Sequence, residues 1–135
     1  MKRMFATSIL TILLGLTAMA KDYNVVDYGA VSDTTQLSTE AIQWAIDSCS
    51  EAGGGRVVVA AGSYKIGTLV LRSHVDLHLE MGATLYGSTD LKDYRKMKSD
   101  YVSLRTQTST IQLIYADRVE DVAISGFGTI DGTHC

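Results

Sequence analysis

Leu77-His78-Leu79-Glu80-Met81-Gly82 is the stretch that decides the fold, because it matches Val57-Val58-Val59-Ala60-Ala61-Gly62 at an offset of 20 residues. Both stretches have apolar residues at their first and third positions and end in Gly. The same offset relates Gly67 to Gly87. Alternating apolar and polar residues are typical of a strand with one buried face, and a Gly after such a run marks a turn.

A third copy lies at an offset of 45 residues. The matched pairs are Leu77 with Val122, Leu79 with Ile124, Thr84 with Thr129, Leu85 with Ile130, and Gly87 with Gly132. Repeats of about 20 residues that combine short strands with Gly turns are typical of a parallel β-helix. We therefore predict an all-β, right-handed parallel β-helix whose coils stack in phase. Leucine-rich repeats lack support because their Leu/Asn spacing is absent, and a β-sandwich is not expected to repeat in phase.

One amphipathic helix precedes the repeats. Its apolar residues Ile42, Ala45, Ile46 and Cys49 fall on one helical stripe, and the Gly53-Gly54-Gly55 run stops it. The first coil has no earlier neighbour, so we expect this stripe to cover its open end. Trp44 lies off the stripe, and we expect it to cover a neighbouring element rather than to offer a platform for sugars.

The chain divides into three predicted regions. Residues 1–20 combine Lys2 and Arg3, an apolar run and Ala18-Met19-Ala20, which predicts a secretory signal peptide cleaved after Ala20. Residues 21–55 form the capping helix and, before it, a short strand within Tyr23–Ala30 that ends in a Gly turn. Residues 56–135 form the first coils, with an inserted surface loop over about 88–110. No lid pattern follows the last coil, so we expect the chain to be truncated there.

Composition excludes several functions. A net charge of −3 without a basic stripe argues against a nucleic-acid partner, and a secreted chain has no membrane partner once its signal is removed. We expect Cys49 to be a buried free thiol. With only Cys135 besides, no zinc pattern exists. We expect no metal or organic cofactor, and the sequence does not fix the oligomeric state.

Other titratable residues are expected at the surface. Asp76 and Glu80 share the outer face of a strand, and Asp131 lies in a Gly-flanked turn. His74 and His78 are four residues apart, a spacing that suits a metal on a helix but falls on a turn and an outer strand face here.

The inserted loop is the candidate for substrate binding. Ser88–Thr110 holds five basic and three acidic residues, a positive balance in an acidic protein. Such a loop attracts a polyanion. The candidates are Lys96 and Lys98 for charge, and Tyr94 and Tyr101 for stacking on sugar rings.

Several segments carry a resemblance to a known family. They are Tyr23–Ala30, Ala41–Asp47, Gly53–Val59, Leu77–Leu85 and Gly126–Gly132. Together they resemble the N-terminal part of glycoside hydrolase family twenty-eight, the polygalacturonases and their relatives, particularly bacterial members. Two departures are Ala60, where the family usually has Pro, and Ser32, where a loop Gly is common.

The resemblance implies a secreted, periplasmic or extracellular, hydrolase of the galacturonic-acid linkages of pectin, acting by inverting acid/base hydrolysis. The family's Asn-Thr-Asp, Asp-Asp, Gly-His-Gly and Arg-x-Lys motifs follow the Gly-Thr-Ile-Asp-Gly segment, and none occurs here. No catalytic residue transfers to this chain, which we expect to be inactive alone. Two alternatives remain: a polysaccharide lyase or depolymerase, and a non-catalytic glycan-binding β-helix protein.

Overall fold

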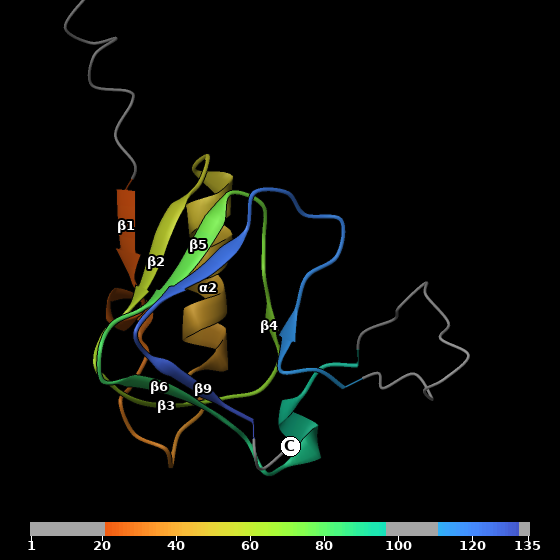
Figure 1. Ribbon diagram of the computed structural model, residues 1–135. Coiled ribbons are helices and arrows are strands. Elements are labelled where there is room, and N and C mark those ends of the chain that lie inside the picture. Colours follow the sequence, from red (N-terminus) through yellow and green to blue (C-terminus); the bar gives the residue numbers. More distant parts are fainter. Residues whose placement is uncertain (1–20, 97–110, 133–135) are drawn as a thin grey trace, which may run out of the picture.

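The computed structural model describes residues 21–96 and 111–132 (Figure 1). The chain order of elements is β1 (Lys21–Asn24), the 3₁₀ helix η1 (Val25–Tyr28), α2 (Thr39–Glu51), β2 (Gly55–Val59), β3 (Gly62–Ile66), β4 (Leu69–Val70), β5 (Val75–Leu79), β6 (Ala83–Gly87), the 3₁₀ helix η2 (Leu91–Asp93), β7 (Ile114–Tyr115), β8 (Ala123–Gly126) and β9 (Thr129–Asp131). The predicted signal peptide lies outside the described residues.

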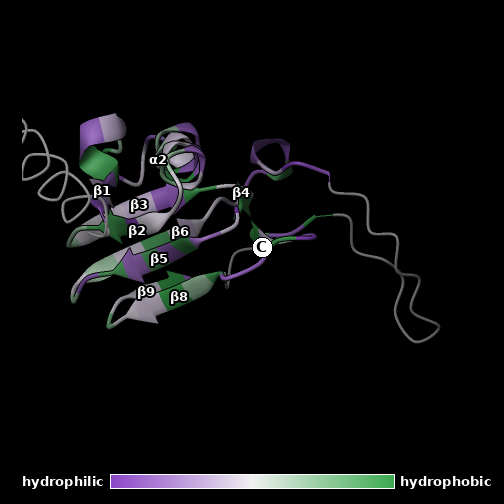
Figure 2. Ribbon diagram, turned by 90° about the horizontal axis from the view of Figure 1, so that it is seen from above, coloured by the Kyte–Doolittle hydropathy of each residue, from purple (hydrophilic) through white to green (hydrophobic). Residues whose placement is uncertain are grey.

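Every strand pairing between named strands is parallel. Three sheets run along the stack, in the orders β1-β2-β5-β8, β3-β6-β9 and β4-β7. Two coils, β2-β3-β4 and β5-β6-β7, contribute one strand to each sheet, and β8 and β9 add the next layer to the first two sheets (Figure 2). The predicted parallel β-helix is confirmed.

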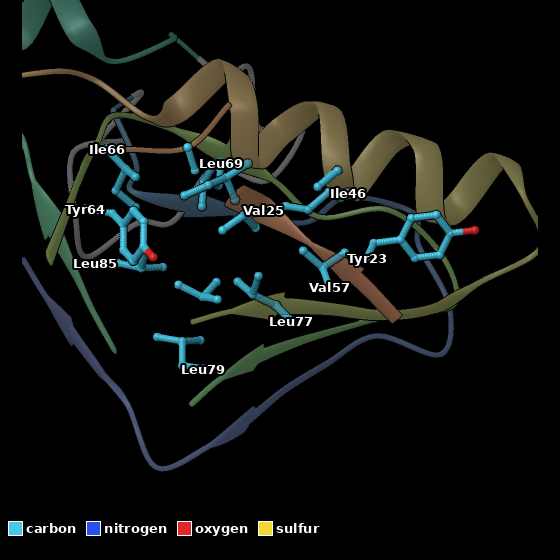
Figure 3. Close-up of a cluster of buried hydrophobic side chains, with 14 of the residues drawn as sticks. Tyr23, Val25, Ile46, Val57, Tyr64, Ile66, Leu69, Leu77, Leu79 and Leu85 are labelled. Atoms are coloured by element: carbon cyan, nitrogen blue, oxygen red, sulfur yellow. The ribbon is translucent and has the colours of Figure 1, made fainter. Parts of the chain in front are cut away.

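Inside the coils, side chains stack in columns. Val57 pairs with Leu77 and Val59 with Leu79 across β2 and β5, and all four residues are buried. Tyr64 and Leu85 form the matching column of the second sheet. These columns point toward one another within the coil (Figure 3), because alternate residues of a strand face the same side.

The amphipathic helix is confirmed as the lid of the first coil. The four residues of its predicted stripe are all 0% exposed and belong to the central core. Gln43 adds a polar link, since its Oε1 accepts from Val70 N at 2.8 Å and its Nε2 donates to Val70 O at 2.9 Å. The Gln43 side chain thus makes the two hydrogen bonds to the backbone of β4 that a neighbouring strand would otherwise make.

The first strand is shorter than predicted. It ends at Asn24, whose side chain accepts from Val26 N at 3.1 Å and begins η1. Gly29 ends η1 with φ 101°, a left-handed conformation that favours Gly. The predicted Gly turn is therefore confirmed, whereas the residues between Asn24 and Gly29 form a 3₁₀ helix rather than the expected strand.

The predicted register is right for two strand pairs and wrong for others. Thr84 pairs with Thr129 as predicted, but Leu77 pairs with Ile124 rather than Val122. The chain advances from Leu79 to Thr84 between paired positions in one coil but only from Gly126 to Thr129 in the next, so a single offset cannot serve both strands. A slip of two residues keeps the inward face inward.

The register between β3 and β6 in the second sheet also differs from the predicted one. Gly62 pairs with Ala83 rather than with Gly82, at an offset one residue longer than in β2 and β5. The third sheet, β4-β7, has strands of only two residues and was not predicted.

Part of the predicted surface loop is packed against the coils. Ser88 and Tyr94 are 1% and 7% exposed, and the backbone carbonyl of Asp93 lies so close to Gly67 that a Cβ there would meet it at 1.8 Å. Thr89, Asp90, Leu91 and Lys92 are exposed, as a surface loop requires, whereas Ser88 and Tyr94 anchor its ends to the coils. Residues 97–110 of the insert lie outside the described residues.

Candidate functional site

Polar side chains gather in a hollow on the outer face of the β3-β6-β9 sheet. Its volume is about 670 Å³, and its lining consists of Ser32, Asp33, Thr34, Ser63, Lys65, Tyr86, Gly87 and Thr89. We call it the Lys65–Tyr86 hollow. The outward positions of β3 and β6 supply its floor, since their inward neighbours Tyr64 and Leu85 are in the core.

Lys65 and Tyr86 are direct neighbours in the sheet, paired in the parallel register of β3 and β6. Neighbouring strands lie about 5 Å apart, so the aliphatic part of the Lys65 side chain and the phenol ring of Tyr86 lie next to each other. Among the described residues, the Lys65 ammonium has no ion-pair partner. A cation without an ion-pair partner beside a partly exposed ring suits the carboxylate and the ring of a sugar acid.

Asp33 brings a negative charge to the rim of this hollow. The backbone N–H of Thr35 donates to its Oδ1 at 2.9 Å, and the Thr35 hydroxyl donates to the same atom at 2.8 Å. These hydrogen bonds, the backbone one first, hold the pKa of Asp33 below its ordinary value. The carboxyl is therefore ionised and accepts hydrogen bonds, which suits sugar hydroxyls.

The hollow lacks the parts for glycoside hydrolysis. Hydrolysis with inversion needs two carboxyl groups about 6.5–9.5 Å apart, one of them protonated. Among the described residues lining the hollow, Asp33 is the only carboxylate, and it is held ionised. The described lining residues therefore offer one cation and several hydrogen-bonding groups to a ligand, without the carboxyl pair that inverting hydrolysis needs.

The outer face of the first sheet carries a second polar group. Ser125 Oγ donates to Asp76 Oδ1 at 2.7 Å, and His78 Nδ1 lies 2.8 Å from the same Oγ. The Ser125 proton is directed at Asp76, so His78 Nδ1 is the donor to Ser125. In a nucleophilic triad the imidazole stands between hydroxyl and carboxylate, whereas here the hydroxyl is in the middle. The contacts link adjacent coils and do not activate a nucleophile.

Arg56 extends this polar face toward the start of the chain. Its Nη2 lies 3.2 Å from Asp22 Oδ2, across the pairing of β1 and β2. The hydrogen bond and the charge of Asp22 raise the pKa of the guanidinium further. Because both side chains are about half exposed or more, the pair adds little stability.

The predicted substrate-binding residues are only partly within the described chain. Tyr94 is buried, and its hydroxyl donates to Ser88 O at 2.7 Å, which argues against the predicted stacking on a sugar. Lys96 is exposed and forms an antiparallel bridge with Ile111. Lys98 and Tyr101 lie outside the described residues. Lys65 and Tyr86 were not among the predicted site residues, because the repeat offset of 20 residues places Lys65 opposite Leu85 rather than opposite Tyr86.

The two histidines lie where a surface role was expected. His74 has φ 65° in the turn before β5, and its Nδ1 lies 3.3 Å from Asp121 Oδ2. Within the described residues, no group of three or more His, Cys, Asp or Glu side chains is placed to hold a metal ion. In the same part of the chain, no helix is long and apolar enough to cross a membrane.

Comparison with known proteins relates the chain to exopolygalacturonases. The chain is 39% identical over 129 residues to exo-poly-alpha-D-galacturonosidase of Dickeya chrysanthemi, covering 90% of this chain and 21% of that protein. It superposes on the family 28 exopolygalacturonase of Yersinia enterocolitica with a TM-score of 0.75 and 39% identity, covering 85% of this chain and 21% of that one. The chain is a homologue of the family 28 polygalacturonases. It spans about a fifth of the length of these two relatives.

Similarity extends beyond the polygalacturonases. Alginate lyase 7 of Azotobacter vinelandii is 32% identical over 120 residues, which cover 82% of this chain and 13% of that protein. No family model matches the chain. Most of the chain is therefore similar to proteins that are named for different activities.

Proposed function

We propose that the complete protein is a secreted hydrolase of the galacturonic-acid linkages in pectin. The observation that carries this proposal is the 39% identity to an exo-poly-alpha-D-galacturonosidase over 90% of the chain. The reaction is inverting acid/base hydrolysis, in which one carboxylic acid protonates the leaving oxygen and one carboxylate activates water. Side-chain carboxyl groups suffice for these proton transfers.

The segment described here starts the β-helix in this proposal. Its helix covers the first coil, and its outer faces offer cations and hydroxyls without a carboxyl pair suited to hydrolysis. The Lys65–Tyr86 hollow supports contact with a uronate, because Lys65 supplies an unpaired cation beside the Tyr86 ring. The insert residues Lys96, Lys98 and Tyr101 remain proposed substrate contacts, and residues 1–20 remain the proposed export signal.

A lyase is the second candidate, and the similarity to alginate lyase 7 favours it. A lyase removes a proton next to the uronate carboxyl and leaves an unsaturated product, whereas a hydrolase adds water. The two reactions share a polyuronate substrate class, so the shared first coils do not separate them.

Product analysis tests the proposal. The protein encoded by the complete gene is incubated with polygalacturonate, and reducing ends and unsaturated uronates are measured in parallel. We expect new reducing ends, saturated products and, by NMR, an inverted anomeric configuration. Unsaturated products would replace hydrolysis by elimination, and no products from any polyuronate would favour a binding role. We expect no turnover by residues 21–135 alone.

A further inference from the structure

Trp44 is unusually exposed for a tryptophan in a packed helix. It lies on α2, off the buried stripe, and 62% of its surface is accessible. Its ring meets Tyr28 in an edge-to-face contact, with centroids 5.2 Å apart and planes at 80°. This contact orients the indole yet leaves most of it uncovered. Trp44 was expected to cover a neighbouring element, and its ring contact with Tyr28 of η1 is a small contact of this kind.

A hollow of about 360 Å³ lies beside the exposed indole. Its lining comes from α2, from the start of β4 and from the segment after η2, and consists of Thr39, Glu40, Gln43, Trp44, Asp47, Thr68 and Arg95. We call it the Trp44 hollow. It shares no lining residue with the Lys65–Tyr86 hollow, and its size is near the lower end for small-ligand pockets, roughly 300 Å³.

Several polar groups of the Trp44 hollow are already occupied. The Gln43 amide bonds the backbone of Val70, and Asp47 Oδ1 lies 3.1 Å from Arg72 Nε. The Thr68 hydroxyl donates to Gln112 O at 2.6 Å and accepts from Arg95 N at 3.0 Å. The backbone of Arg95 is thereby anchored at the rim.

The Arg95 guanidinium and the Glu40 carboxylate are the groups left for a ligand. Among the described residues, neither side chain has an ion pair or hydrogen bond. A guanidinium matches a carboxylate with two parallel hydrogen bonds, an ionised carboxylate accepts from hydroxyls, and an indole face suits the apolar side of a pyranose ring. A hexuronate presents all three of these features on one ring.

We propose that the Trp44 hollow is a binding site for one uronate residue of a polysaccharide, with the ring on Trp44, the carboxylate on Arg95 and hydroxyls on Glu40. The choice of a uronate rests on the proposed function. The site belongs to the capping helix and holds the polysaccharide without cleaving it.

Fluorescence tests this site directly, because Trp44 is the only tryptophan of the chain. The full chain is titrated with trigalacturonate, and with galactotriose as the uncharged control. We expect a saturable change in Trp44 emission and protection from acrylamide quenching with trigalacturonate. The affinity for galactotriose is expected to be lower by about tenfold or more, since this sugar lacks the carboxylate that Arg95 binds.

Two matched variants test whether Arg95 is the cation that binds the carboxylate of the sugar. Arg95→Gln is expected to weaken trigalacturonate binding about tenfold or more, whereas Lys92→Gln removes a cation from the neighbouring η2 outside the hollow and is expected to leave it unchanged. No saturable change in emission, equal binding of galactotriose, or equal effects of the two variants would overturn the proposal. Loss of hydrolysis in the product assay with binding retained would overturn the proposed function instead.

Discussion

The first and last described coils hold the same inward positions but bury them very differently. Val57, Leu77 and Ile124 occupy one column across three coils, and their exposed fractions are 0%, 0% and 48%. In the second sheet, Tyr64, Leu85 and Ile130 are 1%, 0% and 36% exposed. Apolar character is alike along each column, so the neighbouring layer decides burial.

The first coil reaches full burial because α2 takes the place of a preceding coil. The helix supplies its apolar stripe to the core and the Gln43 amide to the backbone of β4. No described element covers the far side of β8 and β9, where Phe127 is 82% exposed. A β-helix layer thus gains most of its stability from what stacks on it.

The largest expected effect separates the middle and last coils. Leu77→Ala leaves a cavity between two layers, and we expect it to lower the free energy of unfolding by about 3–5 kcal/mol. Ile124→Ala, in the same column, is the control and is expected to cost about 1 kcal/mol, because half of that side chain is already exposed. Urea unfolding of both variants checks this difference. Equal losses would show that the last coil is as well covered as the middle one.

A smaller effect is expected at the polar link of the lid. Gln43→Leu keeps the size of the side chain but removes both hydrogen bonds to Val70, leaving its buried N–H and C=O without these partners. We expect the unfolding free energy to fall by about 2 kcal/mol. Glu40→Leu, on the same helix and without a hydrogen bond to β4, is the control and is expected to change stability little. The idea that Gln43 substitutes for a strand fails if both variants behave alike in thermal and urea unfolding.

The smallest effect concerns reactivity at the lidded end. Cys49 is completely buried, and this burial raises the pKa of its thiol. In a Cys135→Ser background, we expect Cys49 to react with Ellman's reagent only as the chain unfolds, since the thiolate is the nucleophile. Folding favours the neutral thiol, so its contribution to stability is present below the unfolded-state pKa and is lost as pH rises through the folded-state pKa. Fast reaction without denaturant would show that the lid opens readily.

Long, periodic features of the fold were predictable from the sequence. The apolar stripe of α2 and the alternation around Leu77 and Leu79 extend over several residues, so the helical and strand periods can be recognised in the sequence. The two-residue strands β4 and β7 are too short to show a period. The offset of 45 misplaced Ile124 because corners of different length change the register from sheet to sheet.

The candidate site was less predictable than the fold. Lys65 and Tyr86 come together only through the register of β3 and β6, which the predicted offset of 20 misses by one residue. Tyr94 was taken for a surface aromatic because the insert is polar overall, yet its ring is buried and its hydroxyl bonds Ser88. Local composition does not reveal which side chain of a loop folds back on the coils.

Cross-linking of β5 to β8 tests the stacked parallel coils most directly. In a Cys49→Ala, Cys135→Ala background, the pairs Asp76→Cys with Ala123→Cys and His78→Cys with Ser125→Cys are directly opposed. Neighbouring strands lie about 4.8 Å apart, within the Cα separation of a disulfide. The account predicts that both pairs oxidise, as read by mass and by resistance to alkylation, and that His78→Cys with Ala123→Cys does not. An antiparallel pairing would allow only one of the two opposed pairs, and that result would contradict the stack.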